Sequence, residues 1–373
     1  MLIGVPKEIK SQEYRVGLTP AAVREYTSNG HRVLVEAGAG QGIGASDEIY
    51  HSAGAEIVDG ADDVFNRVEM IVKVKEPQPN EWKLLREGQI LFTYLHLAPD
   101  RSQTNGLLDS GVTAVAYETI TNDHGGLPLL APMSEVAGRL SIQAAAQCLT
   151  SEAGGRGLLM GGVPGVVPAK IVIIGGGIVG THAARMAVGL GANVTILERS
   201  LPRLARLEEL FGSRIVSRFS TEAALEAEIA AADVVIGAVL VPGATAPKLI
   251  SRESLSNMKD GAVLVDVAID QGGCFATSKP TTHKKPTYVV DNVIHYCVAN
   301  MPGTVPVSSS EALNNATLEF GLLLARDGVS ACKHNSHLRA GLNTHEGKLT
   351  CEPVAAALDK EFTPALDALS SMS

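Results

Sequence analysis

The sequence predicts an α/β protein with two doubly wound parallel sheets that are joined by long helices. Three observations support this fold class. The chain has 373 residues, enough for two domains at roughly 150 residues each. It contains 38 Gly but only 7 Phe, 7 Tyr and 1 Trp, and small residues let helices pack closely on a twisted sheet. Short apolar runs alternate with amphipathic segments of helical length, which is the pattern of βαβ units.

The first series of strands is predicted within the N-terminal 125 residues. Thr19 is expected to cap a helix that has Pro20 at its first position and that Gly30 ends. The predicted strands are 2–5, 32–36, 70–74, 90–95 and 112–118.

A second series begins at Ala169. Between the two series, residues 134–149 have helical spacing and predict a rigid connector. After Pro306 the pattern predicts a helix over 311–326 and then a polar, irregular stretch over 334–350. The tail is too short to fold alone, so we expect it to return to the first domain. The predicted strands are 170–174, 193–197, 214–217, 233–239, 262–267 and 287–290, with helices over 181–190 and 222–231 between them.

Charge and cysteine content exclude several classes of protein. The formal net charge is −9, and no basic run exists to bind nucleic acid or an anionic membrane surface. The five cysteines lie far apart and form no CxxC pair, so we expect neither disulfides nor a metal site. No signal peptide and no apolar run of membrane-spanning length is recognised. We therefore expect a soluble, cytoplasmic protein.

A glycine-rich loop follows the strand at 170–174. Gly175, Gly177 and Gly180 form a G-x-G-x-x-G pattern that leads into a helix. The first glycine would make the tight turn, the second would let backbone amides approach a pyrophosphate, and the third would allow close helix packing. In this context the pattern predicts a dinucleotide-binding Rossmann domain. A tight turn without any ligand is the alternative.

Glu198, at the end of the next strand, bears on the choice of dinucleotide. A carboxylate there would accept hydrogen bonds from the adenosine ribose diol and repel a 2′-phosphate, which favours NAD over NADP. Arg199 and Arg203 lie close in sequence and are the alternative, because they could hold a phosphate. Both arginines could also be solvated charges on a helix face.

Charged residues follow three of the predicted strands. Lys75, His96 and Asp270 come after the strands at 70–74, 90–95 and 262–267, and Arg15 lies in the first loop. Ligands of open α/β sheets bind beyond the carboxyl ends of strands. This set would suit hydride transfer to or from a small α-substituted acid.

Each of these residues also has a structural interpretation. His96 could be a hydrogen-bonded structural histidine, Lys75 a surface lysine before a turn, and Arg15 a solvated side chain. Asp266 competes with Asp270 for one role, and the other aspartate would bind backbone amides or a helix end.

Taken together, these segments resemble the alanine dehydrogenases. The likeness covers nearly the whole chain and rests on blocks in a fixed order. They are 3–8 (IGVPKE), 15–20 (RVGLTP), 72–77 (VKVKEP), 92–97 (FTYLHL), 132–138 (PMSEVAG), the glycine loop, 266–270 (DVAID) and 295–303 (HYCVANMPG).

The resemblance implies a substrate-side domain of residues 1–128 and 307–373, an NAD-binding Rossmann-like domain of residues 129–306, and a homohexamer. It implies reversible oxidative deamination of L-alanine to pyruvate and ammonia with NAD. On this likeness Arg15 and Lys75 bind the substrate, and His96 and Asp270 carry the acid and base chemistry. Beyond the glycine loop, the residues implied to contact the dinucleotide are Ser134, Ile178, Val179, Glu198, Arg203, Ser220, Val239, Leu240, Val267, Ala268, Ile269, Asp270, Lys279, Val298, Ala299, Asn300 and Met301.

The chain departs from the family pattern in two places. Glu198 stands where Asp is usual, and Val307 with residues 308–311 replaces a more basic, threonine-containing stretch. Two other functions are considered: the soluble nucleotide-binding component of a proton-translocating transhydrogenase, and a dinucleotide-binding sensor without turnover. The presence of both His96 and Asp270 in their blocks favours the dehydrogenase.

Overall fold

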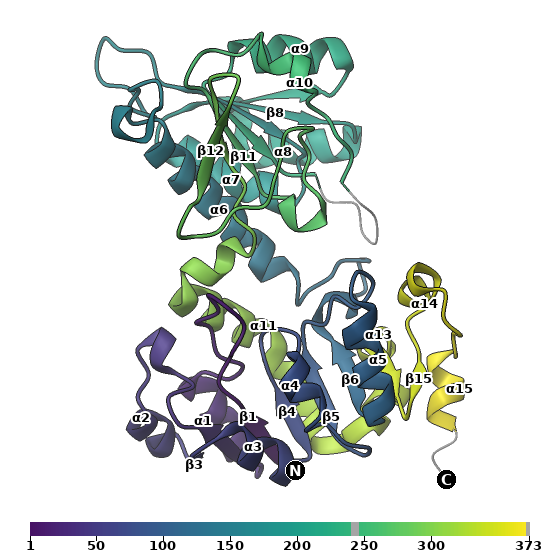
Figure 1. Ribbon diagram of the computed structural model, residues 1–373. Helices are drawn as coiled ribbons and strands as arrows, with labels where there is room; N and C mark the ends of the chain where they lie inside the picture. The colour runs from purple at the N-terminus through teal and green to yellow at the C-terminus, as the bar shows by residue number, and fades with distance from the viewer. Residues whose placement is uncertain (240–245, 371–373) are drawn as a thin grey trace. The chain divides into compact units, whose positions relative to one another are not determined.

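The computed structural model describes residues 1–239 and 246–370. They form two compact units, 1–133 with 305–373 and 134–304. Helix α6 (Ala131–Cys148) carries the chain from the first unit into the second. Both units are α/β with mainly parallel sheets (Figure 1), so the predicted fold class is confirmed. Within the described ranges, no helix is both long and apolar enough to cross a membrane.

The first unit contains an eight-stranded sheet. Strands β1 to β6 are parallel and take the spatial order 3-2-1-4-5-6, which is the order of a dinucleotide-binding doubly wound sheet. From edge to edge the strands are β15 (Lys348–Leu349), β14 (Leu342–His345), β6 (Thr113–Ala116), β5 (Ile90–Thr93), β4 (Met70–Val72), β1 (Leu2–Val5), β2 (Arg32–Glu36) and β3 (Glu56–Val58).

Both faces of this sheet are buried, which explains why its strands are continuous apolar runs. In β2, Val33 and Val35 join one apolar cluster and Leu34 joins the other, because successive side chains point to opposite faces. Helices α1 (Pro20–Ser28) and α11 (Pro306–Asp327) cover one face, and α3 (Ala61–Arg67), α5 (Arg101–Ser110) and α14 (Glu352–Leu358) cover the other. The remaining helices of this unit are α2 (Asp47–Ser52), α4 (Pro79–Trp82), α12 (Ala331–His334), α13 (Ser336–Ala340) and α15 (Ala365–Ser370).

The second unit contains a seven-stranded sheet. Six of its strands are parallel and repeat the 3-2-1-4-5-6 order, and β12 pairs antiparallel at one edge. From edge to edge the strands are β12 (Thr287–Val290), β13 (Val293–Tyr296), β11 (Val263–Asp266), β10 (Val234–Gly237), β7 (Lys170–Ile174), β8 (Asn193–Glu198) and β9 (Ile215–Phe219).

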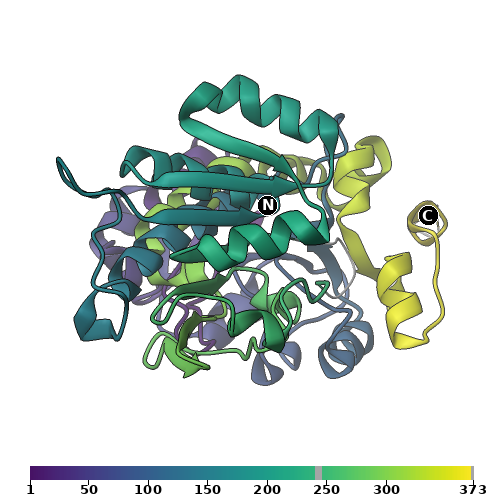
Figure 2. The same ribbon diagram turned by 90° about the horizontal axis from the view of Figure 1, so that it is seen from above.

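Helices also cover both faces of the second sheet (Figure 2). Ile171 and Ile173 of β7 join one apolar cluster, and Val172 and Ile174 join the other. Helices α6, α7 (Ile178–Gly189) and α8 (Leu201–Phe211) pack on the first of these faces, and α9 (Glu222–Ala231) and α10 (Arg252–Leu255) pack on the second.

The polar stretch at 334–350 was wrongly expected to be irregular. It contains the last residue of α12, helix α13 and the hairpin β14–β15. Glu346 and Gly347 of the hairpin both have positive φ, of 47° and 76°, as a two-residue type I′ turn requires. The polar strand β14 is buried because its side chains are hydrogen-bonded: Thr344 donates to the carbonyl of Val112, and Thr113 bonds the ring of His345. Strands β3 and β13 were also not predicted.

Candidate active site

Three predicted substrate-site residues lie at one edge of the first sheet. The strands β1, β4 and β5 are parallel, so their carboxyl ends meet at the same edge. Arg15 lies in the loop after β1, Lys75 follows β4 and His96 follows β5. The sheet order therefore brings together residues that are up to 81 positions apart in the chain.

Arg15 is buried in an ion pair with Glu13. Its Nε and Nη2 donate to the two carboxylate oxygens of Glu13 at 2.7 and 2.6 Å, and its Nη1 lies 3.0 Å from the sulfur of Met133. Burial opposes the charge, but the hydrogen bonds and charge of Glu13 outweigh it and raise the pKa of Arg15. With its side chain 2% exposed, Arg15 is not the solvated arginine of the alternative interpretation.

Lys75 is half-buried and its main chain is held from two sides. Glu8 accepts hydrogen bonds from the amides of Val74 and Lys75 at 2.6 and 3.3 Å, and the hydroxyl of Thr93 donates to the Lys75 carbonyl at 3.0 Å. Lys75 is thus tied to neighbouring segments of the sheet edge.

His96 has an accessible ring on a constrained backbone. Its φ is +50°, and its amide donates to Oε1 of Glu118 at 2.6 Å. The ring stacks on Tyr94 with the ring centroids 5.8 Å apart, and its Nδ1 lies 3.8 Å from Glu118. The side chain remains 46% exposed. The main chain is therefore fixed while the ring remains accessible to a small molecule.

Sequence reasoning missed three residues of this edge, namely Glu13, Tyr94 and Glu118. Tyr94 is buried, its hydroxyl donates to the carbonyl of Leu129, and it interacts electrostatically with both Arg15 and Glu118. One signal was available for Glu118. It comes two residues after β6, which neighbours β5 in the sheet, and the carboxyl ends of adjacent parallel strands lie together.

The glycine loop lies at the carboxyl edge of the second sheet, between β7 and α7. Gly175 has a φ of +102°, and a Cβ there would lie 2.6 Å from the carbonyl oxygen of Ala238. A Cβ at Gly180 would lie 1.9 Å from the carbonyl of Gly175, whereas none of the described atoms beyond its chain neighbours comes within 4 Å of the Cβ position at Gly177. A ligand could therefore approach the backbone at Gly177, beside the N-terminus of α7, which is what the predicted pyrophosphate contact requires.

Glu198 and Arg203 hold the two sides of Gly176. Oε2 of Glu198 accepts from the Gly176 amide at 2.8 Å, and Nε of Arg203 donates to the Gly176 carbonyl. Nη2 of Arg203 also donates to the hydroxyl of Thr181 at 2.8 Å. Arg203 is therefore engaged with the glycine loop, whereas Arg199 is exposed.

The other predicted dinucleotide contacts gather at the same edge, because they follow parallel strands. They come directly after β9, β10, β11 and β13. Ser134 lies in α6, and Lys279 has its amide bonded to the hydroxyl of Tyr288 at 2.7 Å. Leu240 lies outside the described residues. The predicted residues at the strand ends are Ser220, Val239, Val267, Ala268, Ile269, Asp270, Val298, Ala299, Asn300 and Met301.

The two aspartates of this edge have different surroundings. Asp266 is fully buried and accepts hydrogen bonds from the amides of Ala268 and Cys274 and from the hydroxyl of Ser278. Burial raises the pKa of Asp266 despite these bonds. Asp270 is exposed in a single 3₁₀ turn, Ile269–Gln271. Asp266 therefore shapes the loop, and Asp270 is accessible for chemistry.

Comparison with known proteins covers almost the whole chain. Residues 4–137 match the family model for the alanine dehydrogenase/PNT N-terminal domain, and residues 141–352 match that for the alanine dehydrogenase/PNT C-terminal domain. An alanine dehydrogenase of Halomonas elongata is 57% identical over 98% of this chain and 99% of its own length. The alanine dehydrogenase of Bacillus subtilis is 52% identical over 100% of this chain and 99% of its own length.

Two solved structures are similar over most of their length. One L-alanine dehydrogenase has a TM-score of 0.94 at 51% identity and covers 96% of this chain and 99% of its own. A transhydrogenase from Sinorhizobium meliloti has a TM-score of 0.83 at 25% identity and covers 94% of this chain and 100% of its own. The two family models and the near-full-length relatives agree, and the chain belongs to the alanine dehydrogenase/PNT family.

Proposed function

We propose that the protein is an NAD-dependent alanine dehydrogenase that interconverts L-alanine and water with pyruvate and ammonia. The observation that carries the proposal is the 57% identity with an alanine dehydrogenase over 98% of the chain. The transhydrogenase structure matches at 25% identity, so the dehydrogenase is the favoured activity. The sheet-edge residues Arg15, Lys75 and His96 supply the chemistry that this reaction needs.

Arg15 and Lys75 bind the substrate. The guanidinium of Arg15, oriented by Glu13, pairs with the substrate carboxylate. The ammonium of Lys75 donates a hydrogen bond to the oxygen on C2 of pyruvate and offsets negative charge that develops there. Together they orient C2.

His96 and Asp270 move protons. An imidazole can both donate and accept a proton, and the ring of His96 is accessible, so His96 exchanges a proton with the C2 oxygen, the substrate nitrogen and water. Asp270, exposed at the edge of the second sheet, orients or activates ammonia or water. The dinucleotide, when bound, would supply the group that accepts the hydride from C2 of alanine.

Membership in the family implies a nicotinamide dinucleotide, and we propose that it is NAD. Glu198 ends β8 and accepts amide hydrogen bonds from Gly176, Arg199 and Ser200. A carboxylate has about four acceptor sites, so it retains capacity for a ribose hydroxyl. Its charge would repel the 2′-phosphate of NADP. The family resemblance further supports a homohexamer in the cytoplasm, and light scattering of the purified protein would test the homohexamer.

A spectrophotometric screen tests the proposed function. Purified protein is given L-alanine, L-serine, glycine or 2-aminobutyrate with NAD or with NADP. We expect NADH formation with L-alanine and NAD, and the reverse reaction with pyruvate, ammonium and NADH. Dinucleotide binding without turnover of any amino acid would support the sensor, and turnover only with membrane partners would support the transhydrogenase component.

A further inference from the structure

We propose that Glu8 is a positioning residue for Lys75, because its buried carboxylate holds the amides from which the Lys75 side chain departs. This inference rests on the proposed function, in which Lys75 binds the C2 oxygen of the substrate. Glu8 itself is not a substrate contact in this proposal. It acts through the main chain.

Glu8 replaces a missing strand partner. Pairing of β4 with β1 is made at Ile3–Met70 and Gly4–Ile71, and β1 ends at Val5. The amides of Val74 and Lys75 lie beyond that pairing, and Oε1 of Glu8 accepts from both of them, at 2.6 and 3.3 Å. A buried amide without an acceptor is costly, so the carboxylate fixes the chain where the ladder with β1 has ended.

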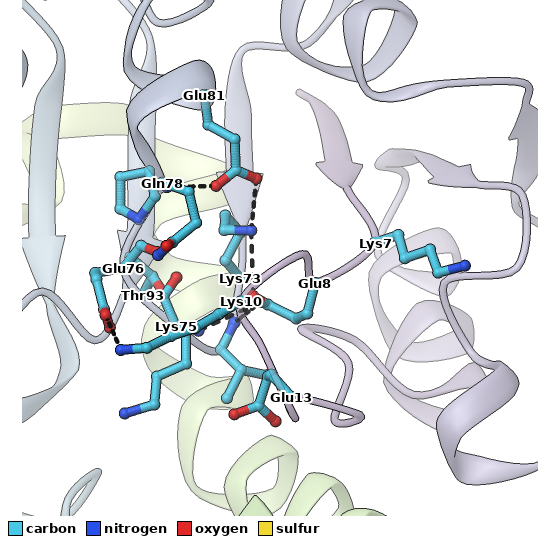
Figure 3. A network of polar contacts seen from close by, with 12 residues as sticks. Lys7, Glu8, Lys10, Glu13, Lys73, Lys75, Glu76, Gln78, Glu81 and Thr93 are labelled. Atoms are coloured by element: carbon cyan, nitrogen blue, oxygen red, sulfur yellow. Dashed lines mark hydrogen bonds and ion pairs between the residues drawn. The ribbon is translucent and has the colours of Figure 1, made fainter. Parts of the chain in front are cut away.

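Lys73 holds Glu8 in this position. Its ammonium lies 3.2 Å from Oε2 of Glu8 and 2.8 Å from Oε1 of Glu81, and the three side chains are 1 to 3% exposed (Figure 3). Burial disfavours the Lys73 charge, but the two carboxylates outweigh it and raise the pKa of Lys73. Glu81 in turn accepts from the amide of Gln78 at 2.6 Å. One cation therefore joins the loop after β1 to the start of α4.

The contacts of Lys73 with Glu8 and of Glu8 with the Lys75 amide lead to a residue of the proposed substrate site, which indicates a role in catalysis. A buried ion cluster is by itself weak evidence for stability. Here, however, the carboxylate that Lys73 contacts at Oε2 accepts the amide of Lys75 at its other oxygen, Oε1, and the hydroxyl of Thr93 donates to the carbonyl of Lys75 at 3.0 Å. Lysine has a long flexible side chain, so the position of its ammonium depends on a fixed starting point. A misplacement of about 1 Å in a reacting group costs on the order of 10²-fold in rate.

A double-mutant cycle on the full chain tests this role. The variants are Glu8→Gln, which keeps the shape but removes the charge, Lys75→Ala, and their combination. We expect Glu8→Gln to lower kcat/KM for pyruvate about tenfold or more with little change in KM for NADH. In the Lys75→Ala background the same substitution should have almost no further effect, because groups that act through one another are not additive. If Glu8→Gln lowered kcat/KM by the same factor in the wild type and in Lys75→Ala, the positioning role would be overturned.

Glu36→Gln is the matched control. Glu36 ends β2 in the same sheet and accepts the amide of Lys7 at 2.8 Å, so it too is a carboxylate that holds a main-chain amide. It makes no contact with the Lys75 amide, and we expect near-wild-type kcat/KM for pyruvate. If Glu8→Gln does not fold, Glu8→Asp takes its place, because it keeps the charge and shortens the reach to the same amides.

Amide hydrogen exchange separates this inference from the proposed function. Peptides that contain residues 73–76 should exchange faster in Glu8→Gln, while peptides of the second unit keep the wild-type rate. Unchanged exchange at 73–76 would overturn the proposal that Glu8 holds the amides of Val74 and Lys75, independently of the reaction that the enzyme catalyses. A wild-type protein without alanine-dependent turnover would instead overturn the proposed function.

Discussion

Glu13 and Arg15 form a bidentate ion pair in the interior of the first unit, with N–O distances of 2.7 and 2.6 Å. The amide of Arg15 also donates to Oε1 of Glu13 at 3.0 Å. Both side chains are almost fully buried. One carboxylate thus fixes the backbone and the guanidinium plane of the same arginine, which leaves little freedom in how Arg15 meets a substrate carboxylate.

Glu13→Gln should destabilise the first unit and weaken substrate binding. Removal of one partner from a buried ion pair costs about 3 kcal/mol or more, so we expect the thermal midpoint to fall by about 5 °C or more. KM for pyruvate should rise because the guanidinium loses its orientation. Arg326→Gln is the control, since Arg326 pairs with Asp327 on the exposed surface, where such pairs contribute little. Equal shifts in both variants would contradict the role of the buried pair.

His96→Asn should lower kcat about 10²-fold and leave NADH affinity near wild type. Asn is chosen because position 96 has a φ of +50°, which Asn tolerates better than most residues. Asp270→Asn should lower kcat similarly. His124→Asn, at an exposed site, is the control, and an unchanged kcat in His96→Asn would make that histidine structural.

Cofactor preference should depend on Glu198. Like-charge repulsion and lost hydrogen bonds against a 2′-phosphate each cost about 1 to 3 kcal/mol, so the wild type should prefer NAD by about 10²-fold or more in kcat/KM. Glu198→Gln should narrow that ratio. The ratio is the informative quantity, because Glu198 also holds the Gly176 amide and its loss affects both cofactors.

Arg203→Gln is the companion variant for this measurement. Its guanidinium holds the Gly176 carbonyl and Thr181, so we expect lower efficiency with both cofactors and an unchanged ratio. A ratio that changed in Arg203→Gln and not in Glu198→Gln would assign the discrimination to Arg203.

Stability of the second unit should decrease at acidic pH because of His295. Its Nδ1 lies 3.0 Å from the carbonyl of Val293, and its Nε2 lies 2.7 Å from the hydroxyl of Thr277. The carbonyl only accepts, so the neutral ring carries its proton on Nδ1 and accepts from Thr277 at Nε2. Burial lowers the pKa of His295.

The sign of this effect follows from proton binding. The unfolded histidine takes up a proton below about pH 6.5, whereas the folded one does so only at lower pH, so stability is lost as pH falls below about 6.5. The thermal midpoint should fall between about pH 7.5 and 5.5, and His295→Gln should reduce that fall. His51→Gln, on the surface, should not, and an equal fall in wild type and His295→Gln would contradict the prediction.

Local sequence was sufficient for much of the fold. The apolar runs at 170–174 and 193–197 predicted β7 and β8 because both sheet faces are buried, and Thr19–Pro20 predicted the start of α1 because helix caps act over a few residues. The glycine loop was recognised for the same reason. The tight turn and the close approach of a ligand to the backbone depend on backbone geometry at three nearby positions.

Tertiary structure decided where a polar residue finds its partner. Strand β14 was missed because Thr344 bonds Val112, 232 residues earlier. The choice between Asp266 and Asp270 was open in the sequence, since one ends the strand and the other follows it by four residues. Folding places the amides of Ala268 and Cys274 against Asp266 and leaves Asp270 exposed, which supports the proposed role of Asp270. A pattern along the chain reports which side chains must be buried, but a buried polar group needs a specific donor or acceptor, and only the folded chain determines which one it meets.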